Sequence, residues 1–287
     1  MDVSIIIVNY NTRDLTCQCI DSVIKKTEGV NYEIIVVDNA SSDDSVATIE
    51  KKYPEVVLLP KAENMGFGRA NNAGAEVATG RYFFMLNSDT ILVENVIKSF
   101  FDFMESNCQY SACGCNLINA DGVMVPAHGN FPSLLFEMTN YNHINKLFRS
   151  YFRNKIAISQ TSLEGNIEDT DYISGADIFI RAEDFRKVGG FDKSIFMYFE
   201  ETDLFTRMKK AGMKSCILPQ FTIIHLVGGT KTSNFQRIAM YEKGRIYYYR
   251  KNYSRFYAFM VKIVKMIMMV FSKNDQKRKM IDLYAHL

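Results

Sequence analysis

Three short clusters of polar residues in this chain have the side chains that metal binding and proton transfer require. Asn87-Ser88-Asp89 ends an apolar run, Glu200-Glu201-Thr202-Asp203 follows an aromatic run, and His225 precedes the loop Gly228-Gly229-Thr230-Lys231-Thr232. Carboxylates bind hard divalent cations, which in turn bind phosphate oxygens. A positioned Glu or Asp also accepts protons as a general base. One interpretation of these clusters is therefore a metal ion that holds phosphate, with a catalytic carboxylate at a helix N-terminus.

Each cluster also has a purely structural interpretation, and the residues alone leave both open. Ser88-Asp89-Thr90 could cap a helix that begins near Val93. The acidic residues at 200–203 suit the N-terminal end of a helix, where the helix dipole favours negative charge. His225 could be an ordinary structural histidine. The choice depends on whether the fold brings the three clusters together.

The elements that must position these clusters are predicted by apolar runs that alternate with helical patterns. The apolar runs span residues 3–9, 33–37, 56–59 and 82–86. Such alternation predicts a parallel sheet with right-handed crossovers. Ligands bind such sheets at the carboxyl ends of the strands. Asn9, Asp38 and Asp89 each lie at or just after the end of a run, so we expect them at one edge of the sheet.

The second half of the chain shows further elements and one long irregular segment. Helices are predicted at 93–104 and 182–188, strands at 110–117 and 172–181, and short apolar stretches at 216–218 and 222–224. Residues 118–170 either shape a substrate site or form a surface excursion.

The glycines at 66, 68 and 74 superficially match a dinucleotide-binding fingerprint. That fingerprint belongs in the first strand-to-helix turn, and residues 9–12 contain no glycine. A Walker phosphate-binding loop is also absent from the sequence. We therefore do not predict either kind of nucleotide site.

Charge is divided unevenly along the chain, although the net charge is only +2. Residues 231–287 contain 13 basic and 3 acidic residues, whereas residues 1–230 contain 21 and 29. The tail is the part that would meet an acidic surface. The six cysteines lack zinc-site spacing, and no signal peptide or membrane-spanning run is evident. We expect a cytoplasmic chain in a reducing compartment.

The tail contains a predicted basic amphipathic helix within residues 255–273. Apolar residues recur at helical spacing and basic residues accompany them. The apolar set is Phe256, Phe259, Met260, Ile263, Val264, Ile267, Met268 and Phe271, and the basic set is Arg255, Lys262, Lys265 and Lys273. Such a helix suits peripheral binding to the anionic inner face of a cell membrane. Packing on the body of the protein or in a homodimer remains an equal alternative.

Six motifs in one order resemble glycosyltransferase family 2, and most closely its bacterial rhamnosyltransferase-like branch. The resemblance runs from Val3 to about Arg250. The motifs are Val8-Asn9-Tyr10-Asn11, residues 37–43, residues 63–67 with Ala70, Asn71 and Asn72, residues 86–90, Ser174-Gly175-Ala176 with residues 189–192 and 196–204, and His225 with Gly228-Gly229-Thr230. Each motif is weak alone, but their shared order is specific.

This resemblance implies a fold, a division of the chain and an activity. The fold is the GT-A fold, an α/β fold with a Rossmann-like, mostly parallel sheet flanked by helices, here with a C-terminal amphipathic helical tail. The catalytic domain would span 1–230, with a nucleotide-binding half (1–115) and an acceptor-binding half (116–230), before a basic tail (231–287). The activity would be inverting transfer of a sugar, from dTDP-rhamnose or a UDP-hexose, to an acceptor hydroxyl in bacterial surface polysaccharide assembly.

The resemblance also implies partners and the role of each site residue. The partners are a nucleotide diphosphate sugar and a glycan or lipid-linked acceptor, with no nucleic acid. Glu201 would be the general base, with Glu200 beside it and Asp203 as a rival. Asp89 and His225 would hold Mg²⁺ or Mn²⁺. The nucleotide-binding residues would be Asn9, Asp38, Asn39, Glu63, Asn64, Gly66, Asn72 and Ser88, and the acceptor-side residues Ser174, Gly175 and Ala176.

Two positions depart from the family pattern. Asn87 occupies the first metal-carboxylate position, so Asp89 carries the metal prediction, and Glu201 stands where the family has Asp. These departures keep a second class open, a nucleotide-sugar binding protein that has lost catalysis. A sugar-nucleotide pyrophosphorylase is less well supported, because its glycine-rich triphosphate loop is missing from the first turn.

Overall fold

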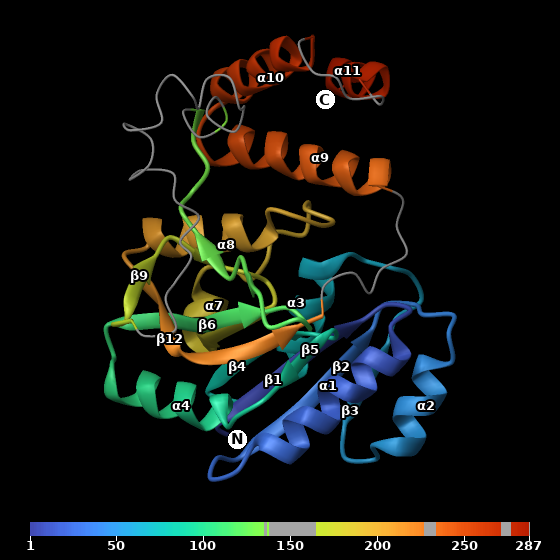
Figure 1. Ribbon diagram of the computed structural model, residues 1–287, viewed down its shortest axis with the longest axis vertical. Helices are drawn as coiled ribbons and strands as arrows, with labels where there is room; N and C mark the ends of the chain where they lie inside the picture. Colours follow the sequence, from blue (N-terminus) through green and yellow to red (C-terminus); the bar gives the residue numbers. More distant parts are fainter. Residues whose placement is uncertain (135–136, 138–164, 227–233, 271–276, 287) are drawn as a thin grey trace.

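A mixed sheet of ten strands forms the centre of the described part of the protein (Figure 1). The structure is a computed structural model, and it describes residues 1–134, 137, 165–226, 234–270 and 277–286. In spatial order the main path of the sheet is β3 (Val57–Pro60), β2 (Tyr32–Asp38), β1 (Val3–Asn9), β4 (Tyr82–Asn87), β11 (Asp177–Arg181), β6 (Tyr110–Ile118), β12 (Lys214–His225) and β5 (Thr90–Leu92). Strands β7 (Met124–Val125) and β9 (Glu168–Thr170) add to β6 and β12, and β8 (His128–Gly129) pairs with β10 (Tyr172–Ile173) in a separate sheet.

The register of the strands brings the predicted polar residues to one edge. Strand β1 is parallel to β2 and β4, with Asn9 opposite Asp38 and Val8 opposite Asn87. Strand β11 is antiparallel to both β4 and β6, and β12 is parallel to β6. Strand β12 therefore runs in the same direction as β1 and β4. Its last residue, His225, reaches the same edge as Asp38 and Asn87.

Helices cover both faces of the sheet because alternate strand residues point to opposite sides. On one face, β1 residues such as Ile5 and Ile7 pack with α1 (Arg13–Lys26), α2 (Ser45–Lys52) and α4 (Val96–Ser106). On the other face, Ile6 packs with α3 (Phe67–Val77), α7 (Ala182–Lys187) and α8 (Glu200–Lys210). The predicted fold, a mostly parallel sheet flanked by helices, is confirmed.

The structure decides one open alternative, breaks one predicted strand and joins two short apolar stretches. Residues 88–90 do not cap a helix, because β5 begins at Thr90 and the Asn95 side chain caps α4 by accepting from the Lys98 amide at 3.4 Å. The predicted strand 172–181 is broken at Ser174–Ala176. The two apolar stretches after residue 215 belong to one strand, β12, which remains paired with β6 across a register shift.

The C-terminal segment forms a helical layer above α8 (Figure 1). It consists of α9 (Asn234–Asn252), α10 (Arg255–Val270) and α11 (Lys277–His286). Their buried residues form a third apolar cluster, to which Phe199 of the main body also belongs. Among the described residues, no helix is long and apolar enough to cross a membrane. The predicted boundary between residues 230 and 231 lies outside the described residues, and the one between 115 and 116 falls within β6.

Candidate active site

The carboxyl ends of β1, β2 and β4 surround a cavity of about 160 Å³. Its described lining residues are Val8, Tyr10, Thr12, Asn39, Asn64, Phe67, Asn87, Ser88, Asp89 and Met197. Four predicted nucleotide or metal residues, Asn39, Asn64, Ser88 and Asp89, thus share one cavity. Its position at the strand ends is where open α/β sheets bind ligands.

Asn9 and Asp38 form a buried network beneath this cavity. The side-chain amide of Asn9 donates to Asp38 Oδ1 at 2.6 Å and to Ser41 Oγ at 3.0 Å. Asp38 Oδ2 accepts from the backbone amide of Ser41 at 2.9 Å. Asn9 Oδ1 accepts from the Thr12 and Thr16 hydroxyls. Both residues are almost fully buried. The network ties the loops after β1 and β2 together and so shapes the cavity floor.

A second network shapes the loop before α3. Asn39 donates to Asn64 Oδ1 at 2.9 Å and accepts from the Met65 amide, while Asn64 also accepts from the Gly66 amide. Gly66 has φ of +84°, and a Cβ there would collide with the carbonyl of Phe196. That carbonyl accepts from the Phe67 amide at 3.1 Å. The loop of Phe196 and Met197 is therefore held against the start of α3.

Asp89 and His225 form the one carboxylate–imidazole contact at this edge among the described residues. Asp89 Oδ1 lies 3.2 Å from His225 Nε2, and both side chains are partly exposed. The side-chain nitrogen of Asn87 lies 3.5 Å from the same histidine nitrogen. The Leu226 amide donates to the Asp89 carbonyl at 2.8 Å, which fixes the two strand ends together. Carboxylate oxygen and imidazole nitrogen suit a divalent metal such as Mn²⁺. No third acidic, Cys or His ligand joins them within the described chain.

Five of the eight predicted nucleotide-binding residues do not line the cavity. Asn9, Asp38 and Gly66 belong to the two networks just described, whereas Asn72 and Glu63 belong to neither. The Asn72 amide donates to the Phe191 carbonyl at 2.8 Å, and its oxygen accepts from the Phe191 amide at 2.9 Å. It thereby joins α3 to the turn before α8. Glu63 is exposed. A motif match alone could not distinguish these positions from cavity-lining ones, because hydrogen-bond partners more than 100 residues away are not evident from the sequence.

The loop between β10 and β11 places Ser174–Ala176 beside the end of β4. The Ala176 carbonyl accepts from the backbone amide of Asn87 at 3.1 Å, and the backbone amide of Ser174 donates to the Ala127 carbonyl at 2.7 Å. A Cβ at Gly175 would lie 3.2 Å from the Phe67 ring. This loop therefore reaches the cavity from the side opposite β2.

Glu200 and Glu201 begin α8, whose N-terminus lies on the same side as this loop. Burial raises the pKa of both carboxyl groups, and the neighbouring Glu201 charge raises the pKa of Glu200 further. Glu200 is 5% exposed, and its Oε2 has no hydrogen-bond partner within the described chain. The charge of Glu201 also contributes to the raised pKa of Tyr172. A carboxyl group with a raised pKa is a stronger proton acceptor once ionised.

Two aromatic residues before α8 adopt left-handed backbone conformations that the sequence did not predict. Tyr198 has φ of +68° and Phe199 has φ of +70°. Such conformations cost roughly 1–3 kcal/mol each in residues other than glycine and cluster at functional sites. The pair redirects the chain so that Glu200 and Glu201 start α8. Only an unusual run of aromatic residues marks this point in the sequence.

Asp203 is fully buried and both its oxygens are occupied. Oδ2 lies 2.8 Å from both Arg207 Nε and Lys251 Nζ, and Oδ1 accepts from the Asn252 amide at 2.8 Å. Its partners on α9 make it an anchor between α8 and the C-terminal layer.

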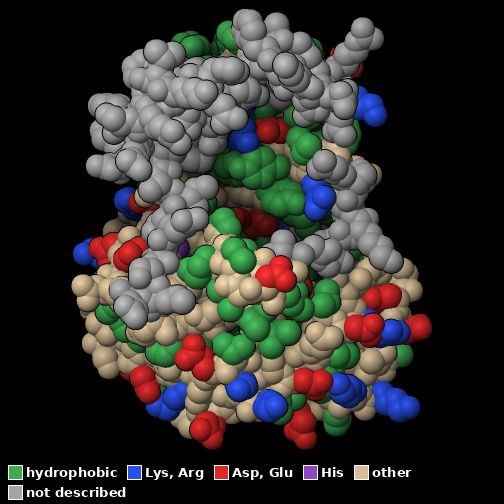
Figure 2. Space-filling model, viewed as in Figure 1, with side chains coloured by type: hydrophobic (Ala, Val, Ile, Leu, Met, Phe, Trp, Pro, Cys, Tyr) green, Lys and Arg blue, Asp and Glu red, His purple; other side chains and the backbone are tan. Residues whose placement is uncertain are grey.

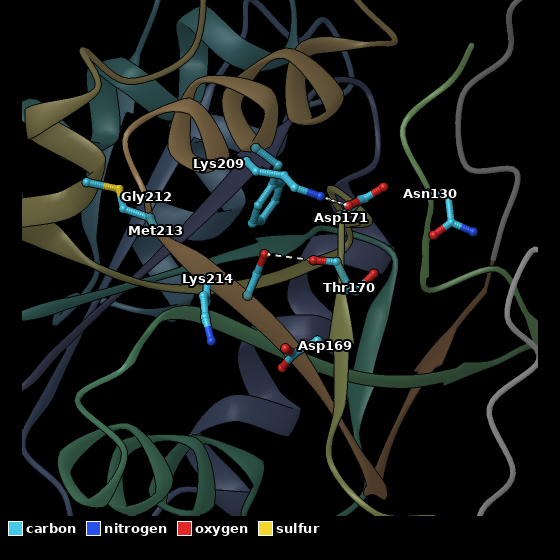
Figure 3. A pocket seen from close by; sticks show the side chains of 10 residues that line it. Asn130, Asp169, Thr170, Asp171, Lys209, Gly212, Met213 and Lys214 are labelled. Carbon is cyan, nitrogen blue, oxygen red and sulfur yellow. Dashed lines mark hydrogen bonds and ion pairs between the residues drawn. The ribbon is translucent and has the colours of Figure 1, made fainter.

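A separate cavity of about 360 Å³ lies at the opposite edge of the sheet, at the start of β12 (Figure 3). Lys209 points toward Asp171 and forms an ion pair with it at 2.5 Å, and Ser215 donates to the Thr170 carbonyl at 3.2 Å (Figure 3). Asp169 accepts from the Tyr110 hydroxyl. The cavity lies at the opposite end of β12 from His225, so it is not part of the candidate site.

Comparison with known proteins identifies the family to which this site belongs. A sequence profile described as glycosyl transferase family 2 matches residues 4–164, which is more than half of the chain. The chain belongs to glycosyl transferase family 2. The prediction from the motifs is thus confirmed.

Two similar proteins are named as bacterial sugar transferases. The chain is 28% identical over 206 residues to N-acetylglucosaminyl-diphospho-decaprenol L-rhamnosyltransferase of Mycobacterium tuberculosis, covering 67% of this chain and 66% of that protein. It is 30% identical over 133 residues to an Escherichia coli UDP-Glc:alpha-D-GlcNAc-diphosphoundecaprenol beta-1,3-glucosyltransferase, covering 46% and 53%. The chain therefore spans less than two thirds of the length of these relatives.

Solved structures with the same fold include one bound to a nucleotide sugar and one bound to a nucleotide. The mannosyltransferase PcManGT from Pyrobaculum calidifontis, in complex with GDP-Man and Mn²⁺, matches with a TM-score of 0.60 at 13% identity, over 99% of this chain and 84% of that one. Staphylococcus aureus TarS 1-349 in complex with UDP matches with a TM-score of 0.56 at 13% identity, over 96% and 73%. These likenesses establish the GT-A fold of this glycosyltransferase.

Proposed function

We propose that this family 2 glycosyltransferase transfers a sugar, with inversion, from a nucleotide diphosphate sugar to a hydroxyl of a lipid-linked glycan acceptor. The observation that carries the proposal is the Asp89–His225 pair at the cavity, with the raised-pKa carboxyl of Glu201 on the acceptor side. The names of relatives that act on diphospho-decaprenol and diphosphoundecaprenol acceptors support a lipid-linked acceptor and a rhamnosyl or hexosyl donor. Surface polysaccharide assembly is the corresponding process.

In this proposal Glu201 is the general base. Its carboxylate takes the proton of the acceptor hydroxyl while the acceptor oxygen bonds to the anomeric carbon, and the bond from that carbon to the diphosphate oxygen breaks. Asp203 is less suited to this role because Arg207, Lys251 and Asn252 occupy its oxygens. General acid–base catalysis by a positioned side chain typically raises the rate by roughly 10²–10⁴-fold.

Asp89 and His225 would hold Mg²⁺ or Mn²⁺ at the diphosphate, with Asn87 close to the His225 ring. The metal would supply positive charge that stabilises the diphosphate as it leaves. Solved structures of the same fold that contain Mn²⁺ support a divalent metal. Asn9 and Asp38 would shape the floor of the nucleotide pocket, whereas Asn39, Asn64, Gly66 and Ser88 would line or support it. Asn72 would act by holding α3 in place, and Glu63 would contact the donor only from the exposed loop.

The helix α10 supports a peripheral membrane contact as part of the same function. Its outward face exposes Phe256 (73%), Phe259 (54%) and Ile267 (54%), whereas Ala258 and Val261 pack inward. The prediction that Lys265 adds charge to the outward face was wrong, because it is buried and forms an ion pair with Glu137 at 2.6 Å. Phe271 and Lys273 lie outside the described residues. A homodimer contact through the same face is the alternative.

Thermal stabilisation tests the donor proposal directly. The melting temperature would be measured with UDP, dTDP and GDP, each with and without Mn²⁺, because a specific ligand stabilises the folded state in proportion to the logarithm of its concentration. One nucleotide is expected to stabilise the protein only when the metal is present. Release of that nucleotide from its sugar donor would then separate an active transferase from a binding protein without catalysis. Absence of stabilisation by all three nucleotides would contradict the proposal.

A further inference from the structure

A second cavity, of about 380 Å³, adjoins the first and has α9 as its far wall. Tyr10, Asn64 and Met197 line both cavities. The remaining described lining residues are Phe196, Gln236, Ala239, Met240 and Lys243. Figure 2 shows a hollow between the helical layer and the sheet domain, with hydrophobic side chains in it. The C-terminal layer therefore borders the same open space as the predicted donor site.

The first cavity is too small to hold a nucleotide diphosphate sugar alone. Pockets that enclose small ligands usually have volumes of roughly 300–1,000 Å³, whereas this one has about 160 Å³. A donor whose diphosphate lies at Asp89 must extend into neighbouring space. The second cavity supplies that space without any rearrangement of the described residues.

With the proposed roles of Asp89 and Glu201, the order of the strands indicates which part of the donor enters the second cavity. The sequence of elements along the edge runs from β3 and β2 through β1 and β4 to β11. Asp89 follows β4, and the acceptor-side loop lies at β11. A sugar that points from Asp89 toward Glu201 leaves the nucleoside pointing the other way, toward β1, β2 and β3. Tyr10 follows β1 and Asn64 follows β3, and these two residues open into the second cavity.

We infer that the nucleoside of the donor lies between the strand ends and α9, in contact with Tyr10, Met197 and Met240. This inference rests on the proposed function and assigns a donor-binding role to the C-terminal layer. The apolar side chains of Met197 and Met240 suit the face of a base, since thioethers make favourable contacts with aromatic rings. Lys243 is the one charged residue among the described lining residues, and its charge complements the anionic donor. Phe196 lines this cavity and is 44% exposed, while its backbone carbonyl is held by the hydrogen bond from the Phe67 amide.

The test separates the nucleoside from the diphosphate. Dissociation constants would be measured by calorimetry, with Mn²⁺ present, for UDP, dTDP, GDP and inorganic pyrophosphate. Met240→Glu puts a charge against the base and Met240→Ala removes the contact with less disturbance. Val77→Glu is the control, because Val77 is also an exposed apolar helix residue (44%) but lies outside both cavities. Asp89→Ala serves as the reference for loss of the diphosphate contact.

The expected result is a loss of affinity that depends on the nucleoside. Met240→Glu should weaken the preferred nucleotide at least tenfold and Met240→Ala several-fold, with pyrophosphate within twofold of wild type and Val77→Glu unchanged. Asp89→Ala should weaken both ligands. Nucleotide affinity within twofold of wild type in both Met240 variants would overturn the inference and leave the proposed function intact. Equal weakening of nucleotide and pyrophosphate would also overturn it. If wild type bound none of the three nucleotides, both proposals would fall.

Discussion

Gly244 of α9 lies directly against the backbone carbonyl of Tyr198, so that a Cβ at position 244 would be 2.5 Å from that oxygen. The Tyr241 ring packs beside this contact, with centroid distances of 5.7 Å to Tyr198 and 5.0 Å to Phe199. The two residues with left-handed conformations are therefore held in place by a helix of the C-terminal layer. This contact links that layer to the position of Glu201.

Gly244→Ala should reduce stability and turnover together. Helix propensity alone would favour alanine by roughly 0.5–1 kcal/mol in the middle of a helix. The clash with Tyr198 opposes that gain and should move α9 or residues 198–199, and Glu201 with them. Urea unfolding and initial rates would measure the two effects. A more stable protein with wild-type kcat would contradict the prediction.

Glu201→Gln should lower kcat by about 10²–10⁴-fold, because the amide cannot accept the acceptor proton. The Mn²⁺-dependent affinity for the nucleotide should stay within twofold of wild type, since Glu201 lies on the acceptor side. Steady-state rates and calorimetry measure the two quantities. Wild-type turnover in this variant would remove Glu201 from the mechanism.

Turnover should fall on the acidic side at a pH above the ordinary range for a glutamate. Burial raises the pKa of Glu201, so the group stays protonated, and unable to accept a proton, until the pH exceeds that raised pKa. As the pH rises through it, activity should appear. A profile of kcat/KM against pH measures this limb, and it should be missing from the residual activity of Glu201→Gln. A wild-type profile that is flat down to pH 4.5 would contradict the prediction.

Asp203→Asn should damage stability more than chemistry. Breaking a buried ion pair by removing one partner usually costs about 3–5 kcal/mol, and Asp203 is fully buried with Arg207 and Lys251 as partners. Chemical unfolding measures the loss. At a temperature where the variant remains folded, kcat should stay within tenfold of wild type. Unchanged stability with turnover lost would make Asp203 the better candidate for the base.

The outward face of α10 should bind anionic membranes. Phe256→Glu with Phe259→Glu should strongly reduce flotation with phosphatidylglycerol vesicles. The two substitutions replace apolar contact with the membrane by repulsion between the glutamates and the anionic lipids. Val123→Glu is the control, since Val123 is 59% exposed far from this helix in the sequence. A chain cut before Arg255 is a poorer test, because it would also remove Ala258 and Val261 from the third apolar cluster. Equal flotation of wild type and the double variant would exclude membrane binding through this face.

The local elements and the order of the motifs could be predicted from the sequence because they depend on neighbouring residues. Apolar runs such as Val3–Val8 bury both faces of a strand, and strands that alternate with helices form a parallel sheet. The carboxyl ends of such strands share an edge, which is why Asn9, Asp38 and Asp89 could be placed together. Family membership followed from the same motifs.

The tertiary structure decided which polar residues face the ligand and which hold the fold. Asp203 and Glu201 lie two residues apart in one acidic run, yet side chains of α9 occupy the Asp203 oxygens, whereas burial raises the pKa of Glu201. Asn72 matches a nucleotide motif but pairs with the Phe191 backbone, and Lys265 matches a basic surface but is buried against Glu137. Each outcome depends on a partner distant in the sequence. Side-chain pattern gives the elements, whereas burial and hydrogen bonding across the fold determine what each polar group can do.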